Sequence, residues 1–128
     1  MKIRHIAIWT NDLERLRDFY QKYFGLKYGN KYVNASKGFS SYFLTFENGP
    51  SIEIMTREDI EDRAEENKQT VGFAHIAISV REKALVNSLT ERLRLDGYRV
   101  IGNPRLTGDG FYESVILDPD GNHIEITE

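Results

Sequence analysis

The residues with the clearest chemical potential are two histidines and two glutamates in matching local sequences. Each histidine starts a His-Ile-Ala-Ile segment, and each glutamate lies between two isoleucines in a closing Ile-Glu-Ile segment; the four are His5, Glu53, His75 and Glu125. Imidazole nitrogens and carboxylate oxygens together suit zinc, nickel, cobalt, manganese or iron(II). Four such ligands would leave two positions of an octahedral ion open, and open positions are typical of catalytic metal sites. The sequence therefore predicts a divalent metal centre that takes part in a reaction.

The same motifs show that the sequence contains one unit twice. His-Ile-Ala-Ile occurs at residues 5–8 and 75–78, and Gly-x-x-Ile-Glu-Ile occurs at 49–54 and 121–126. Two short matches in one order indicate a duplicated module. We expect one domain over residues 1–128 with three parts: module one over about 1–56, a charge-rich linker over about 57–71, and module two over about 72–128.

Composition limits the classes of protein. The chain has 128 residues, no cysteine, 17 basic and 20 acidic side chains, and this length suits one compact domain. The absence of cysteine excludes disulfides, zinc–thiolate sites, iron–sulfur clusters and a cysteine nucleophile. Scattered basic residues argue against a nucleic-acid partner, and no apolar run approaches the roughly 20 residues that span a bilayer. We therefore expect a cytoplasmic protein that binds neither nucleic acid nor membrane.

Periodicity predicts the elements of module one. Alternating branched residues favour a strand over 3–9. Apolar residues at three- and four-residue spacing predict a helix from Leu13, capped by Asn11 and stopped by Gly25. The pair Asn48-Gly49 between two apolar runs predicts a β-hairpin.

Module two repeats this order. We expect a strand over 73–80, a helix over about 82–95 and strands near 98–101, 112–118 and 122–127. The predicted fold class is α+β: two tandem βαβββ modules that form a curved mixed sheet around a metal-containing cleft.

Strand alternation predicts where the four ligands point. Neighbouring side chains face opposite sides of a strand, so the isoleucines pack under the helix while the histidines and glutamates lie on the other face. A carboxylate buried there without a partner would cost several kcal/mol. A lone histidine in an apolar strand is more often a hydrogen-bonded core residue, and a lone glutamate between isoleucines marks a strand that faces water. Two histidines and two glutamates at matching places in a duplicated unit favour a metal site over these single-residue interpretations. His123 has no histidine counterpart in module one, and we expect it to be pocket lining or surface.

The ending Asp-Pro-Asp-Gly-Asn-His-Ile-Glu at 118–125, together with the paired modules, resembles the vicinal oxygen chelate superfamily, also called the glyoxalase/bleomycin-resistance/dioxygenase superfamily. The His–Glu–His–Glu set is similar to that of glyoxalase I, a lactoylglutathione lyase. This resemblance implies that Glu53 and Glu125 are catalytic, with Glu125 as the proton carrier. It also implies metal stabilisation of an enediolate, a small-molecule substrate and a homodimer.

Other members of the superfamily leave alternatives open. Extradiol dioxygenases and fosfomycin-resistance transferases use two histidines and one glutamate, which would map to His5, His75 and Glu125. Bleomycin-binding proteins lack the metal ligands. The first alternative function is therefore a dioxygenase-type enzyme, and the second is a metal-retaining binding or antibiotic-resistance protein.

The substrate pocket departs from the glyoxalase I pattern. Bacterial glyoxalase I has an arginine four residues after the first histidine and an asparagine four residues after the first glutamate; here these places hold Trp9 and Arg57. We expect Trp9, Arg57 and Tyr112 to line the pocket, with Tyr112 at the start of a strand after a glycine-rich loop. The alternatives are simple packing for Trp9 and an ordinary hairpin without substrate contact for the loop and Tyr112. The thiol cosubstrate stays unknown. The expected substrate is a small α-hydroxycarbonyl or a thiol adduct.

Overall fold

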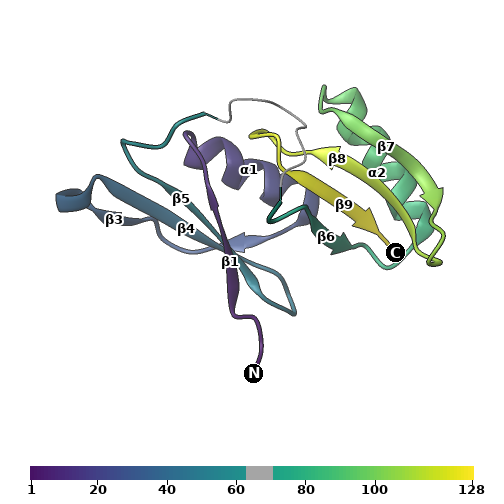
Figure 1. Cartoon of the computed structure of the whole chain (residues 1–128), viewed down its shortest axis with the longest axis horizontal. Helices are drawn as coiled ribbons and strands as arrows, with labels where there is room; N and C mark the ends of the chain where they lie inside the picture. The colour runs from purple at the N-terminus through teal and green to yellow at the C-terminus, as the bar shows by residue number, and fades with distance from the viewer. Residues whose placement is uncertain (63–70) are drawn as a thin grey trace. The chain divides into compact units, whose positions relative to one another are not determined.

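The computed structural model describes residues 1–62 and 71–128. Residues 63–70, which belong to the predicted linker, lie outside the described residues. The chain divides between residues 64 and 65 into two compact units. Both units have the same order of elements: a strand and a helix, followed by strands that complete one sheet (Figure 1). We call them unit 1 and unit 2 and describe each by itself.

Unit 1 forms a mixed sheet. Its elements are β1 (His5–Trp9), α1 (Leu13–Phe24), β2 (Lys27–Tyr28), β3 (Tyr32–Asn34), the short 3-10 helix η1 (Ala35–Lys37), β4 (Phe39–Thr45) and β5 (Ser51–Thr56). The strand order is β1-β5-β4-β2, and β3 also pairs with β4. The first strand runs parallel to β5, whereas β4 is antiparallel to it. The helix α1 contacts β4 and β5 from one face of the sheet.

Helix α1 has well-defined ends. The Asp12 side chain accepts a hydrogen bond from the Arg15 backbone N–H at 3.0 Å, and Gly25 ends the helix in the left-handed region at φ 68°. The predicted cap at Asn11 is therefore wrong by one residue. Leu16 and Tyr20 are completely buried against the sheet, which is where burial of apolar surface stabilises the unit.

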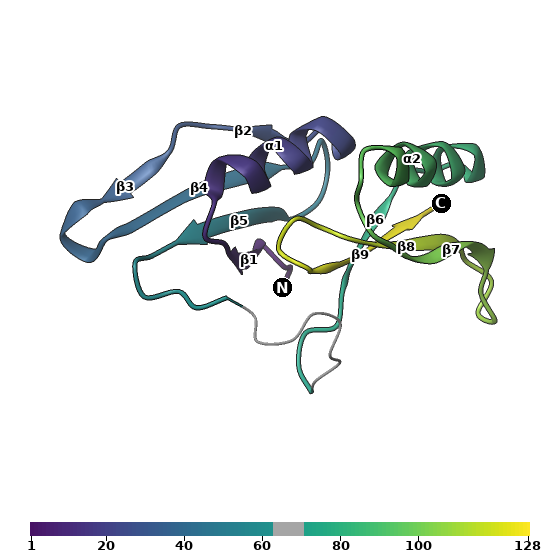
Figure 2. The ribbon, with the colours of Figure 1, turned by 90° about the horizontal axis from the view of Figure 1, so that it is seen from above.

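Unit 2 repeats the arrangement with fewer strands. It contains β6 (Ile76–Ser79), α2 (Lys83–Leu95), β7 (Val100–Leu106), β8 (Tyr112–Leu117) and β9 (His123–Thr127) in the order β6-β9-β8-β7. Strand β6 is parallel to β9, as β1 is to β5. Helix α2 lies along one face of this sheet (Figure 2) and contacts β7, β8 and β9. A buried hydrogen bond of 2.6 Å between Thr90 and Ser114 joins α2 to β8.

The structure confirms the α+β class and both predicted helices. The hairpin at Asn48-Gly49 is also confirmed, because β4 and β5 are antiparallel and Gly49 has φ 114°. Strands β2 and β3 were not predicted. Strand β7 continues past Pro104, beyond the predicted end near residue 101, because an edge strand tolerates proline. Within the described residues, no helix is long and apolar enough to cross a membrane.

Candidate metal centre and adjoining pocket

The first candidate pair lies on two parallel strands of unit 1. The register places Ala7 opposite Glu53, so His5 is two residues away on the same face. His5 Nε2 lies 3.6 Å from Glu53 Oε2, with the carboxylate side chain 16% exposed and the imidazole 37% exposed. The neighbours Ile52 and Ile54 are buried, on the side that faces α1. Alternation along β5 thus presents Glu53 on the face opposite the helix, which we call the helix-free face.

Unit 2 reproduces this pair. Ala77 lies opposite Glu125, and His75 precedes β6 by one residue. His75 Nε2 lies 3.2 Å from Glu125 Oε2, and the side chains are 43% and 20% exposed. The flanking Ile124 and Ile126 are buried. The duplicated sequence therefore produces the same imidazole–carboxylate contact twice, and we call each contact a half-site.

The histidines differ from the predicted placement in one respect. The strands expected over 3–9 and 73–80 would hold both histidines inside a strand, but His5 is the first residue of β1 and His75 lies just before β6. Both glutamates are third in their strands, β5 and β9. The histidines are therefore held at strand entrances, where fewer ladder hydrogen bonds fix the backbone.

The donor chemistry of each half-site fits part of a divalent metal centre. A nitrogen and a carboxylate oxygen lie close together on one face, and both belong to ligand types that zinc and related ions accept. Within the described residues of either unit, no third histidine, aspartate or glutamate joins the pair to make a metal-binding group. One half-site thus supplies two ligands, fewer than the three or four protein ligands of usual zinc centres.

The two half-sites have different neighbours. Phe43 lies directly opposite Glu53 on β4, and its ring meets the His5 ring edge-to-face with centroids 5.3 Å apart. In unit 2 the residue opposite Glu125 is Val115. The sequence contained a signal for Phe43, because it lies in the apolar run that precedes the Asn-Gly turn, but the pairing register was needed to place it beside Glu53.

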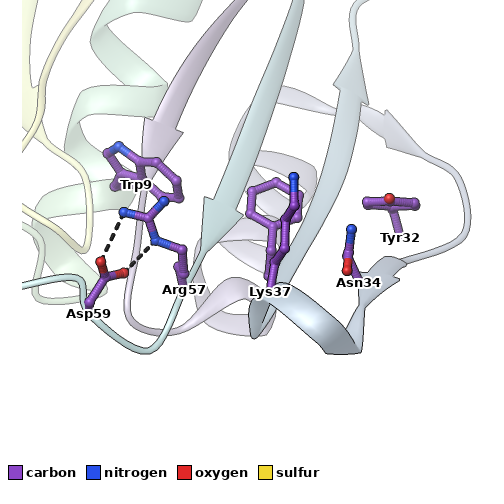
Figure 3. Close-up of a pocket in the computed structure, with 7 residues that line it drawn as sticks. Trp9, Tyr32, Asn34, Lys37, Arg57 and Asp59 are labelled. Carbon is purple, nitrogen blue, oxygen red and sulfur yellow. Dashed lines mark hydrogen bonds and ion pairs between the residues drawn. The ribbon is translucent and has the colours of Figure 1, made fainter.

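A cavity of about 640 Å³ lies in unit 1 and is lined by residues from several elements: Trp9, Tyr32, Asn34, Lys37, Phe39, Arg57 and Asp59 (Figure 3). Trp9 is four residues after His5 and is the last residue of β1. Arg57 is four residues after Glu53 and directly follows the end of β5. At a rise of roughly 3.3 Å per residue, this spacing corresponds to about 13 Å along the strands. The even spacing along β1 keeps Trp9 on the helix-free face that carries the first half-site.

Arg57 and Trp9, both predicted as pocket residues, lie against each other. The Arg57 guanidinium is 5.4 Å from the centroid of the Trp9 ring, and its Nη2 donates to Asp59 Oδ2 at 3.0 Å (Figure 3). A second hydrogen bond runs from Arg57 Nε to Asp59 Oδ1. The hydrogen bond and charge of Asp59 raise the pKa of Arg57, and those of Arg57 lower the pKa of Asp59.

Tyr112 lies elsewhere than predicted. Its hydroxyl donates to Asn87 Oδ1 at 2.9 Å, and the Lys83 ammonium lies 5.4 Å from its ring centroid. Both partners belong to α2, and Tyr112 shares the parity of Ser114, which also contacts α2. Tyr112 is thus on the helix side of its sheet, opposite the face that carries Glu125.

His123, expected as lining or surface, is half-buried at the start of β9. Other lining residues were missed because they lie in elements that were not predicted. Tyr32 and Asn34 belong to β3, whose three residues are too short to show an alternating pattern.

The chain matches known proteins over almost its full length. The model of the Glyoxalase/Bleomycin resistance protein/Dioxygenase superfamily matches residues 2–126. A protein named lactoylglutathione lyase from Arabidopsis thaliana is 29% identical over 97% of this chain and 43% of its own length. The chain therefore spans less than half of that relative. The uncharacterized protein YqjT of Bacillus subtilis is also 29% identical, over 97% of this chain and 96% of its own length.

Solved structures show the same fold. Glyoxalase I from Zea mays superposes with a TM-score of 0.81 at 22% identity, over 98% of this chain and 44% of that one. The trypanothione-dependent glyoxalase I of Leishmania major superposes with a TM-score of 0.78 at 23% identity, over 100% of this chain and 86% of that one. With the family model covering residues 2–126, the chain belongs to the Glyoxalase/Bleomycin resistance protein/Dioxygenase superfamily.

Proposed function

We propose that this chain is a glyoxalase-like, metal-dependent lyase or isomerase that removes a proton from a small α-hydroxycarbonyl or thiol-adduct substrate. The observation that carries the proposal is the repeated half-site, with histidine–glutamate distances of 3.6 and 3.2 Å in the two units. The relatives named lactoylglutathione lyase support it at 29% identity. A protein that only sequesters a small molecule has no need of two such pairs.

In this proposal His5, Glu53, His75 and Glu125 hold one divalent ion. The requirement is that the two half-sites meet, either within one chain or across two chains, because each provides only two ligands. When bound, the ion supplies electrophilic stabilisation of negative charge on adjacent substrate oxygens. The protein's own contribution is to hold the substrate and to move a proton.

The proton carrier we propose is Glu125, which the superfamily resemblance favours over Glu53. Its side chain is only 20% exposed and lies opposite Val115, so its surroundings are partly apolar. Glu53 has the aromatic ring of Phe43 opposite it and is 16% exposed. A carboxylate held beside the substrate can accept a proton from a carbon acid and return it.

Turnover with and without metal tests this function. The purified chain is stripped with a chelator, reloaded with zinc, nickel, cobalt, manganese or iron(II), and assayed on a panel of hemithioacetals made from different thiols. We expect metal-dependent turnover of at least one adduct, with the glutathione adduct a poor substrate because Trp9 replaces a cation. Equal turnover by the stripped and loaded protein would contradict the metal-dependent mechanism.

The alternative of a binding or resistance protein is supported by the size of the cavity in unit 1. About 640 Å³ falls within the roughly 300–1,000 Å³ of small-molecule sites in general. Saturable binding of a small molecule without turnover of any adduct, in metal-loaded protein, would favour this second function.

A further inference from the structure

Three aromatic rings in the unit 1 cavity form a continuous row. The Phe39 ring meets the Trp9 ring edge-to-face at 6.3 Å and the Tyr32 ring at 6.1 Å. They come from three different strands, β4, β1 and β3, yet Trp9 and Tyr32 remain 43% and 56% exposed. Large apolar rings gathered at a cavity and left open to solvent are typical of a ligand site.

The charged groups of the lining favour an anionic ligand. Arg57 is neutralised by Asp59, whereas none of the described carboxylates forms an ion pair with the Lys37 ammonium. Glu58 packs against Gly38, with its Cδ 3.2 Å from the position that a Cβ would take there, but it is outside the lining. The lining therefore holds two cations and one carboxylate.

A polar group beside Lys37 can add a second donor. Asn34 Oδ1 accepts a hydrogen bond from Ser36 Oγ at 2.8 Å. Among the described residues, no acceptor forms a hydrogen bond with the Asn34 amide N–H groups. These N–H groups can therefore donate to a ligand. Gly38, at φ 56°, ends η1 directly after Lys37 and lets the chain turn into Phe39, so that both residues line one cavity.

We propose that this pocket binds a planar aromatic carboxylate. The ring would pack among Trp9, Phe39 and Tyr32, and the carboxylate would accept hydrogen bonds from Lys37 and Asn34. An aromatic cation would find the same rings but would be repelled by Lys37. An aliphatic carboxylate would keep the charge contact and lose the ring contacts.

This assignment names a substrate class for the proposed function and rests on it. The pocket begins about 13 Å along the strands from His5 and Glu53, at four residues of roughly 3.3 Å each. The aromatic carboxylate is therefore the remote end of an elongated substrate whose reacting oxygens lie near the first half-site. Binding energy from such a remote end can orient the reacting end.

Fluorescence provides a direct test because Trp9 is the only tryptophan of the chain. The full-length protein, without added metal, is excited at the red edge of tryptophan absorption and titrated with benzoate, cyclohexanecarboxylate and benzyltrimethylammonium. We expect a saturable change with benzoate, a weaker one with cyclohexanecarboxylate, and no saturable change with the cation. No saturable response to benzoate, or equal affinity for all three probes, would overturn the proposal.

Matched variants test the role of charge. Lys37→Gln should weaken benzoate binding about fivefold, the upper range for an exposed ion pair, whereas Lys27→Gln removes the same charge from β2, outside the lining, and should leave affinity unchanged. Equal affinities of these two variants would contradict the assigned contact. The fluorescence titration uses neither metal nor turnover. An absence of benzoate binding would therefore not contradict the proposed metal centre, and an absence of metal binding would not change the benzoate result.

Discussion

The carboxylate of Glu125 is the side chain on which the proposed chemistry depends most. Glu125→Gln keeps the size and shape of the side chain but replaces one carboxylate oxygen by an amide NH2 group, which removes the group that accepts a proton. We expect kcat to fall about a hundred- to ten-thousand-fold, the usual contribution of a general base, with little change in thermal stability. The measurement is turnover of the best hemithioacetal by wild type and variant at equal metal content.

The matched control for this change is Glu53→Gln, the corresponding substitution in unit 1. Both variants lose one carboxylate ligand, so a comparison at saturating metal separates ligand loss from proton transfer. Unchanged kcat in Glu125→Gln would show that another group moves the proton.

A second residue-scale prediction concerns the Arg57–Asp59 pair at the pocket. Arg57 lowers the pKa of Asp59 below its ordinary value, first through a hydrogen bond and then through charge. A lowered folded-state pKa gives a contribution to stability that is present above the ordinary aspartate pKa and is lost as pH falls through the folded value. Both side chains are exposed, so this contribution is small.

Carboxyl chemical shifts followed by NMR against pH measure this pKa directly. We expect the Asp59 pKa to rise toward its ordinary value in Arg57→Gln, because both the hydrogen bond and the positive charge are removed. Arg15→Gln is a control on α1, away from the pair. An Asp59 pKa that is identical in wild type and Arg57→Gln would contradict the described contact.

At the scale of elements, the start of α1 makes a quantitative prediction. Asp12 accepts from the Arg15 backbone N–H, so Asp12→Ala should reduce the free energy of unfolding by about 1 kcal/mol. Asn11→Ala removes a side chain that hydrogen-bonds Asp62 at the surface and should cost less. Denaturant unfolding followed by circular dichroism compares the two. A larger loss in Asn11→Ala would contradict Asp12 as the cap.

The elements that the sequence predicted are those with strong local signals. Helix α1 has buried residues at three- and four-residue spacing and a left-handed glycine at its end, and the hairpin has Asn-Gly. Strands β2 and β3 are two and three residues long, and their pairing with β4 is fixed by tertiary contacts. The observed N-cap is Asp12 and the predicted one was Asn11, because a sequence pattern does not define a helix end to a single residue.

For the site, alternation was enough to assign each glutamate to the helix-free face, because its flanking isoleucines are buried. The same rule was not applied to Tyr112, which was expected at the pocket because of the glycine-rich loop before it. Its alternation with Ser114 agrees with its observed place on the helix side. The row of three aromatic rings, Trp9, Phe39 and Tyr32, could not be predicted from the sequence. Tyr32 and Phe39 are brought together by the β3–β4 pairing, which has no local sequence signal.

At the scale of the whole molecule, we predict a homodimer. Strands β1 and β6 are edge strands of their sheets, and each begins at or just after the histidine of its half-site. An exposed strand edge tends to pair with another chain unless it is covered. In the proposed metal centre each half-site also needs two ligands from the other half-site, which a second chain can supply. Sedimentation equilibrium at micromolar concentration should give twice the chain mass. A single-chain mass at that concentration would contradict the prediction.

The central claim is that the two half-sites together hold one divalent ion, and metal content measures it most directly. The wild-type chain and the variants His5→Gln, His75→Gln and His123→Gln are loaded with zinc, freed of excess by gel filtration, and analysed for zinc per chain. We predict about one ion per chain in wild type and in His123→Gln, and less zinc retained through gel filtration in both other variants, because each keeps only three of the four proposed ligands and holds the ion less tightly. Full zinc content in either His5→Gln or His75→Gln, or none in folded wild type, would contradict the claim.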